Sequence, residues 1–218
     1  MKNIIALSLL LMLLNSFSLS LAATNRLELA TNIKAKGKRI RVLVDKGAAW
    51  SHKYGFLFVG LDLGPQLAVW TEDTYGNYME TLYVTKFWSG RKEALPYWRQ
   101  RIDQKHPEYI DAVTGATQMK DWTLTSRLGK EQDTIVVKAE LNNSFDYNKY
   151  FTKENSGVNG QPSVVYAATV DIYDREKPYT MKLVGCGSLD GSDGLLHPET
   201  SKLTSAKEII KSLTVEMF

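Results

Sequence analysis

The stretch that decides the fold class is QLAVWTEDTYGNYMETLYVTK, residues 66–86. Leu67 and Val69 share one face of its first half, and the second half, Tyr78–Lys86, alternates in the same way. A period of two is typical of β-strands, because successive side chains point to opposite faces. Between the two runs, residues 73–77 include Asp, Gly and Asn, which favour turns. The stretch therefore predicts a β-hairpin.

Other runs along the chain show the same patterning. Thr134–Leu141 alternates apolar residues with Lys138 and Glu140, and Ser163–Ile172 alternates similarly. Weaker strand signals lie at Leu27–Lys34, Ile40–Val44, Tyr54–Leu61, Tyr179–Gly185 and Leu213–Phe218, and short-helix signals lie at Leu95–Ile102 and Ser205–Lys211. Several short strands with few helices predict a mainly β protein, an antiparallel β-sandwich of immunoglobulin-like architecture with one or two short helices.

The N-terminus has the three parts of a secretory signal. Lys2 is the charged region, Ile4–Leu14 is the apolar region, and small residues up to Ala22 suit cleavage just after it. The apolar run is shorter than the about 20 residues that a membrane-spanning helix needs. We therefore expect a signal peptide at residues 1–22, a single domain at residues 23–218 without a transmembrane segment, and a periplasmic or secreted protein.

Charge and cysteine content restrict the function classes. The chain has 27 Lys and Arg and 24 Asp and Glu; cleavage after Ala22 would remove Lys2 and leave a net charge of 26 minus 24, or +2. This balance gives no reason to expect nucleic acid as a partner. The single cysteine, Cys186, excludes an internal disulfide and is expected to be buried.

The most specific short motif is Asp111-Ala-Val-Thr-Gly-Ala-Thr117. It resembles the flavin-attachment motif of covalent FMN-binding proteins. The resemblance implies that Thr117 carries FMN through a phosphoester, that Asp111 is a recognition residue for a separate flavin transferase, and that Thr114 and Gly115 belong to the same cofactor-binding motif. An alternative remains open, in which Asp111 and Thr114 cap a turn and Gly115 adopts a positive φ angle.

A wider resemblance covers residues 58–172. The segments that carry it, in chain order, are Pro65–Asp73, Thr81–Thr85, Leu95–Arg99, Asp111–Thr117, Ser144–Asn148 and Gly157–Ser163. Their order is similar to that in a family of periplasmic proteins known as domain of unknown function 2271. Members of that family tend to be encoded near flavin transferases and membrane proteins, which implies partners in an extracytoplasmic flavin or metal redox system.

The remaining chemistry-bearing residues form no recognisable catalytic pattern. His52, His106 and His197 lie too far apart for a sequence-local metal site, so no metal ligand is predicted. No serine or cysteine stands in a hydrolase motif, and the aromatic residues Trp70, Tyr83, Trp88, Trp98 and Trp122 are expected to pack in the core. The sequence thus indicates a non-enzymatic accessory or binding protein, with an electron-transfer flavoprotein that carries FMN on Thr117 as the alternative.

Overall fold

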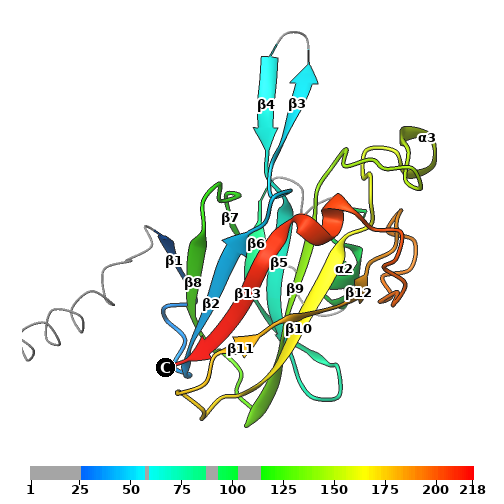
Figure 1. Cartoon of the computed structure of the whole chain (residues 1–218). Helices are drawn as coiled ribbons and strands as arrows, with labels where there is room; N and C mark the ends of the chain where they lie inside the picture. Colours follow the sequence, from blue (N-terminus) through cyan, green and yellow to red (C-terminus); the bar gives the residue numbers. More distant parts are fainter. Residues whose placement is uncertain (1–25, 57–58, 87–92, 103–113) are drawn as a thin grey trace, which may run out of the picture.

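The computed structural model describes residues 26–56, 59–86, 93–102 and 114–218, and most strands within these ranges form two sheets (Figure 1). The first sheet has the order β1 (Leu27–Thr31), β8 (Trp122–Arg127), β2 (Arg39–Lys46), β13 (Ile210–Met217) and β11 (Tyr179–Thr180). The second has the order β12 (Lys182–Cys186), β10 (Val164–Asp171), β9 (Thr134–Asn142), β5 (Gln66–Glu72), β6 (Tyr78–Thr85) and β7 (Thr114–Gly115). The expected mainly β, sandwich-like fold is confirmed.

The other elements lie outside these two sheets. Strands β3 (His52–Phe56) and β4 (Val59–Leu63) form a separate two-stranded ribbon. The helices in the described ranges are α2 (Pro96–Ile102), α3 (Lys153–Ser156) and a 3-10 turn at Ser205–Glu208. No helix in the described ranges is long and apolar enough to cross a membrane.

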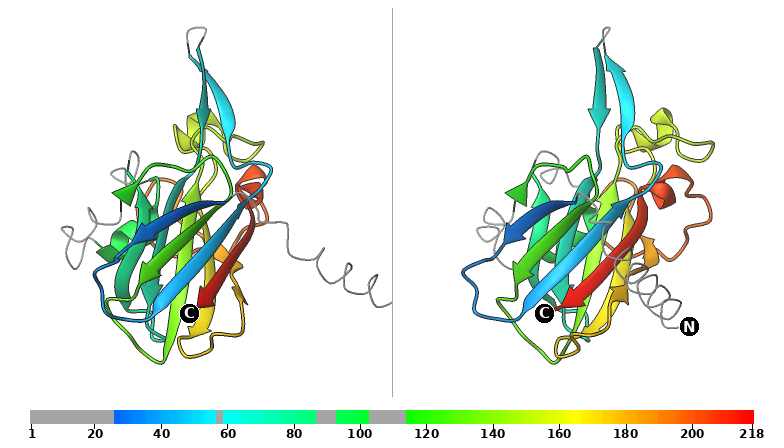
Figure 2. Two further views of the ribbon diagram at one scale, coloured as in Figure 1. Left: turned by 90° about the vertical axis from the view of Figure 1, so that its left-hand side faces the viewer. Right: turned by 60° about the vertical axis from the view of Figure 1, so that its left-hand side comes forward.

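The main core lies between the two sheets, which face one another in Figure 2. In β2 every second residue is buried, and the same alternation occurs in β9. Ile40 and Val42 from the first sheet and Ile135 and Val137 from the second belong to one apolar cluster, and all four are 0% exposed. Period-two patterning therefore did locate the inner face of both sheets.

A second apolar cluster covers the outer face of the second sheet. Helix α2 lies on this face, where Trp98 packs with Trp70 and Ala68 of β5 and Val84 of β6. The part of the second sheet that lies beneath α2 is thus buried on both faces. Every residue of β5 is buried as a result.

The hairpin predicted at residues 66–86 is present as β5 and β6, which pair in antiparallel register. Asp73 stabilises its turn, because one carboxylate oxygen accepts hydrogen bonds from the amides of Tyr75 (2.9 Å) and Asn77 (2.8 Å). The other oxygen accepts one from Asn77 Nδ2 (2.7 Å), and these bonds lower the pKa of Asp73. Gly76 has a φ angle of 84°, which its missing Cβ permits.

Two strand pairs differ from the expected antiparallel arrangement. β1 runs parallel to β8, with Leu27 opposite Trp122, and β7 runs parallel to β6. Both parallel strands are at the edge of a sheet. In the first sheet the reason is topological, since β8 lies between β1 and β2 and prevents them from forming a hairpin.

Some element boundaries also differ from the prediction. Tyr54–Leu61 was expected as one strand, but the chain reverses there and forms β3 and β4. Residues 179–185 divide between the two sheets as β11 and β12. The segment predicted as a helix at Ser205–Lys211 is a 3-10 turn followed by the start of β13, and β8 was not predicted.

Candidate functional site

The FMN-like motif ends in β7, the outermost strand of the second sheet. Gly115 lies opposite Thr85 of β6, and its carbonyl accepts a hydrogen bond from the amide of Lys86 (2.9 Å). Thr114 precedes it in the same strand, whereas Asp111 lies outside the described residues. Gly115 is not among the described glycines with positive φ, so the turn conformation considered for it is wrong.

Tyr83 of β6 fixes the backbone of this strand. A Cβ atom added to Gly115 would lie 2.7 Å from the Tyr83 ring, so that only glycine permits this close approach. The Tyr83 hydroxyl donates a hydrogen bond to the carbonyl of Ala116 (2.6 Å). Burial raises the pKa of Tyr83 to about 12, and the hydroxyl therefore remains a donor at physiological pH.

Thr117 follows directly and is half-buried. Its hydroxyl donates a long hydrogen bond to the carbonyl of Pro65 (3.3 Å), at the start of β5. Gly64 packs against it, since a Cβ there would come within 2.6 Å of Thr117 Cγ2. The hydroxyl is thus weakly held, in a residue that is partly exposed.

The residues after Thr117 are also anchored. The indole nitrogen of Trp50 donates to the carbonyl of Gln118 (2.7 Å), and Trp50 is only 2% exposed. Lys46 Nζ donates to the carbonyl of Met119 (3.0 Å), which places a positive charge two residues beyond Thr117. Residues 114–118, called the motif segment below, therefore have a defined backbone, and Thr117 within them is partly exposed.

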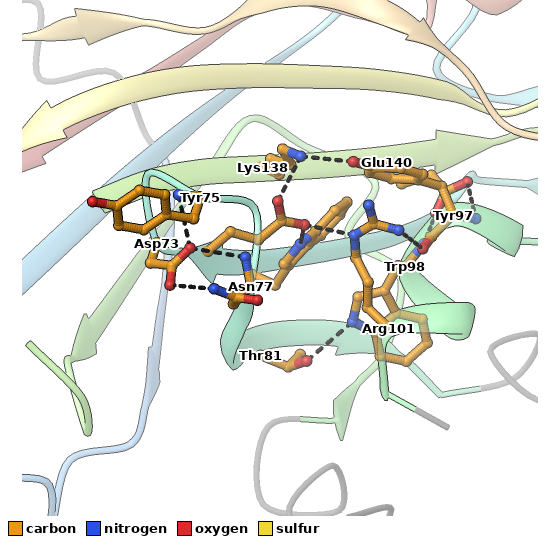
Figure 3. A network of polar contacts seen from close by, with 11 residues as sticks. Asp73, Tyr75, Asn77, Thr81, Tyr97, Trp98, Arg101, Lys138 and Glu140 are labelled. Atoms are coloured by element: carbon orange, nitrogen blue, oxygen red, sulfur yellow. Dashed lines mark hydrogen bonds and ion pairs between the residues drawn. The ribbon is translucent and has the colours of Figure 1, made fainter. Parts of the chain in front are cut away.

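A buried network of charged groups lies beneath α2, on the same sheet (Figure 3). Its centre is Glu72, whose side chain is 1% exposed. Glu72 accepts hydrogen bonds from Trp70 Nε1 (2.9 Å), Arg101 Nε (2.7 Å) and Lys138 Nζ (2.6 Å). Two cations thus compensate one buried carboxylate.

Tyr97 completes the network on the helix side. Its hydroxyl accepts a hydrogen bond from Lys138 Nζ (2.7 Å). The guanidinium carbon of Arg101 lies 3.6 Å from the centroid of its ring, within the range of a cation–π interaction. Both cations therefore contact Tyr97 as well as Glu72.

A second carboxylate, Glu140 of β9, binds the start of α2. It accepts hydrogen bonds from the amides of Tyr97 (3.2 Å) and Trp98 (2.7 Å) and from the hydroxyl of Ser163 (2.6 Å). The amides in the first turn of a helix have no carbonyl partner within the helix, so Glu140 provides the acceptors for two of them. Burial raises the pKa of Glu140 to about 7.

A further contact joins α2 to β6. The indole nitrogen of Trp98 donates to the hydroxyl of Thr81 (3.0 Å), which also bonds the hydroxyl of Tyr78 (2.8 Å). Polar contacts therefore fasten α2 to β5, β6 and β9. The chain that leaves α2 at Ile102 returns at Thr114, so both ends of the intervening stretch are attached to the second sheet.

The aromatic residues pack as the sequence indicates. Trp70 and Trp98 lie in the outer cluster, and Tyr83 lies against Trp122 in the main core with ring centroids 5.0 Å apart. Trp88 lies outside the described residues. Trp70, Trp98, Tyr83 and Trp122 are therefore core residues rather than a stacking site.

Cysteine and histidine give no further site within the described ranges. Cys186 is buried as expected, and burial raises the pKa of its thiol. His197 pairs with Asp193 (3.1 Å), and His106 lies outside the described residues. Among the residues with described positions, no group of three or more His, Cys, Asp or Glu could hold a metal ion.

Sequence reasoning found the motif segment but missed the network. Lys138 and Glu140 were assigned to the opposite face from the apolar residues of their strand, which is correct. Nothing in the alternation showed that a helix covers this face. The signal that could have revealed the network is the short helix that carries Trp98 and Arg101. Such a helix must pack its tryptophan against another element, and the outer face of the sheet is the available one.

Comparison with known proteins found no relative. No family model matches the chain, and neither does any curated protein or solved structure.

Proposed function

We propose that this chain is an exported, periplasmic accessory or binding protein of a flavin or metal redox system, and that it is not itself an enzyme. The observation that carries the proposal is the anchored motif segment at the end of the second sheet. The resemblance of residues 58–172 to domain of unknown function 2271, for which no family model matches the chain, motivates the choice of this setting. An immunoglobulin-like strand arrangement belongs to this proposal too, supported by two sheets that share one core.

The anchoring matters because binding is weakened by the cost of ordering a flexible segment. Here Tyr83 and Trp50 hold the carbonyls of Ala116 and Gln118 from within the core. Ala116 is exposed. A partner would therefore meet a preformed strand end rather than a mobile loop.

Site-specific photocrosslinking in the periplasm tests this proposal. A photoreactive residue at Ala116 is expected to give an adduct with a membrane redox protein. The matched control is Tyr75, which is 91% exposed and lies in the turn at the opposite end of β5 and β6. Absence of an adduct at Ala116, or the same adduct at both positions, contradicts the proposal.

A second function is favoured by the accessibility of Thr117, namely an electron carrier that holds FMN on this residue. The residue is half-buried and its hydroxyl makes a 3.3 Å hydrogen bond, so we expect that a transferase could reach it without unfolding the sandwich. The ammonium group of Lys46, held near Met119, suits a phosphate neighbour. The described residues fit attachment of the phosphate, and the bound flavin would supply the redox chemistry.

Co-expression with a flavin transferase, followed by intact-mass measurement, tests this second function. The expected result is a yellow protein whose mass increases by one FMN less water, and the loss of both in Thr117→Val. Thr180→Val, at an exposed threonine in the other sheet, is the control and should retain the flavin. An unmodified wild-type chain would remove this function and leave the binding proposal standing.

A further inference from the structure

The connection between β1 and β2 carries a concentrated positive charge. Residues 29–44 contain no acidic residue but five cations, which are Lys34, Lys36, Lys38, Arg39 and Arg41. The whole chain has a net charge of only +3. The remaining residues therefore carry a slight excess of acidic side chains, and the basic character of the protein is local to this connection.

The connection forms a turn with an exposed corner. The amide of Ala35 donates a hydrogen bond to the carbonyl of Asn32 (2.9 Å), so Ile33 and Lys34 occupy the two central positions of the turn. Ile33 is 70% exposed, and Lys34 and Lys36 are exposed as well. A large apolar side chain therefore lies at the corner of the turn, beside two exposed lysines.

Backbone hydrogen bonds attach this turn to the first sheet. Gly37 donates its amide hydrogen to the carbonyl of Leu128 (3.1 Å), and Leu128 donates to the carbonyl of Lys38 (3.0 Å). A Cβ atom on Gly37 would lie 2.2 Å from the carbonyl oxygen of Leu128, so only glycine permits this approach. Residues 32–39, called the basic tip below, are thus preformed, and a partner would not have to order them.

A second exposed ring lies beside the basic tip. Tyr173 is 61% exposed, and the ammonium group of Lys38 lies 4.2 Å from its ring centroid, within the range of a cation–π interaction. The carboxylates of Asp133, Glu131 and Asp171 lie near this ring, since their charges raise the pKa of Tyr173. Acidic groups thus border the surface at Tyr173, whereas the basic tip itself has none.

An anionic phospholipid surface matches the basic tip better than an acidic protein does. A specific protein interface needs about 1,000 Å² of complementary surface, and a single turn does not provide this area. A layer of lipid headgroups has no fixed shape, and its negative charge attracts lysines and arginines close to it. An apolar side chain such as Ile33 can enter the boundary between headgroups and acyl chains, while long lysine side chains keep their ammonium groups at the phosphates.

We propose that the basic tip docks the protein onto an anionic phospholipid surface, with Ile33 below the headgroups and the lysines against the phosphates. The tip leads into β2 at the end of the sandwich away from the β3–β4 ribbon (Figure 1). At the other end of β2, Lys46 binds the carbonyl of Met119 beside the motif segment. The eight residues of β2 span about 25 Å. Docking through the tip therefore leaves the motif segment free, and the inference is independent of the proposed function.

Co-sedimentation of the mature chain with unilamellar vesicles tests the proposal. Vesicles that contain phosphatidylglycerol should bind wild type, whereas vesicles of phosphatidylcholine alone should bind it far less. The double variant Lys34→Gln, Lys36→Gln should weaken binding about twentyfold, at about fivefold for each cation, and Ile33→Ser should weaken it about tenfold. The matched control is Lys182→Gln, Lys211→Gln, which removes two exposed lysines outside the tip and should bind like wild type. Unchanged thermal unfolding would show that each variant keeps its sandwich.

A polarity-sensitive fluorophore gives a second, independent measurement. Attached to Ile33→Cys, it should emit at a shorter wavelength on phosphatidylglycerol vesicles, whereas on Lys211→Cys its emission should not change. Cys186 is buried and does not compete for the label. Absence of binding, equal binding to phosphatidylcholine, equal weakening by the control, or the same emission change at both positions overturns the proposal. So does equally tight binding to soluble poly-glutamate or glycerol phosphate, because the tip would then recognise an acidic protein or a free phosphate.

Discussion

Replacing Glu140 by glutamine is expected to remove a pH dependence from the stability of the protein. Glu140 is 0% exposed, and burial raises its pKa from 4.5 to about 7. The folded protein therefore binds this proton more tightly than the unfolded chain, and the free energy of unfolding falls as the pH rises from 4.5 to about 7. At about 1.4 kcal/mol per pH unit, the loss over this interval is about 3 kcal/mol.

Glutamine has the shape of the protonated carboxyl group but does not titrate. Its NH2 group faces the amide of Tyr97 or Trp98, so the variant should be less stable than wild type at low pH. As the pH rises through 7, the free energy of unfolding of wild type falls, whereas that of the variant does not change through this group. The difference in unfolding free energy between the two proteins should therefore change by about 3 kcal/mol in favour of the variant.

Urea denaturation of both proteins at several pH values between 4.5 and 8 measures this change. Because the two proteins are compared at each pH, contributions from other titrating groups such as His52 cancel. A difference that stays constant to within about 1 kcal/mol would refute the reasoning, since each pH unit corresponds to about 1.4 kcal/mol. A change in favour of wild type as the pH rises would refute it as well.

Three further predictions concern the network, the motif segment and the N-terminus. Glu72→Gln should lower the free energy of unfolding by about 3 to 5 kcal/mol in chemical denaturation, because it leaves buried cations uncompensated. The double variant Glu72→Met, Lys138→Met should lower it by less. If both variants lower it equally, the network is not a compensated set of charges. Tyr83→Phe should cost about 1 kcal/mol and accelerate hydrogen exchange at residues 115–118, which mass spectrometry resolves; unchanged exchange would mean that the hydroxyl does not hold the segment. The intact mass of protein from the native periplasm should match a chain that begins at Ala23, and an uncleaved chain would contradict export.

Strand positions could be predicted wherever alternation reflects one buried face. This condition holds for β2 and β9, whose inner residues meet in the main core. It fails at residues 54–61, because β3 and β4 pair there in antiparallel register although the sequence is almost continuously apolar and has no Pro, Asn or Asp to indicate a turn. Strand β8 was not predicted because Trp122 and Leu124 are its only apolar residues, and the remaining four positions, Thr123 and Thr125–Arg127, give it the composition of a polar segment.

The network could not be predicted because its residues resemble those of a solvated sheet face. An antiparallel sheet often has one wet face, and Lys138 and Glu140 are the residues expected there. The structure buries that face under α2, more than 30 residues earlier in the chain. Which sheet face a short helix covers depends on tertiary packing, and a single sequence without covariation does not contain that information.

The two buried carboxylates have a common consequence for α2. A helix of seven residues is too short to be stable alone, so its position depends on what it contacts. Glu140 binds amides of its first turn, and Glu72 binds Arg101 in its last turn. The ends of the helix are thus fixed by directional bonds from two different strands, in addition to the apolar contacts of Trp98.

This arrangement bears on the motif. Buried ion pairs often contribute little net stability compared with apolar residues of the same size, so stability alone is a weak reason for placing Glu72, Lys138 and Arg101 under the helix. The directional hydrogen bonds and ion pairs of these residues instead give α2 a defined position on the sheet. The chain from Ile102 to Thr114 starts at the fixed end of α2 and finishes in a strand held by Tyr83, and its ends cannot drift apart without breaking these bonds. The network and the motif segment therefore fix the two described positions, Ile102 and Thr114, at which the chain leaves α2 and enters β7.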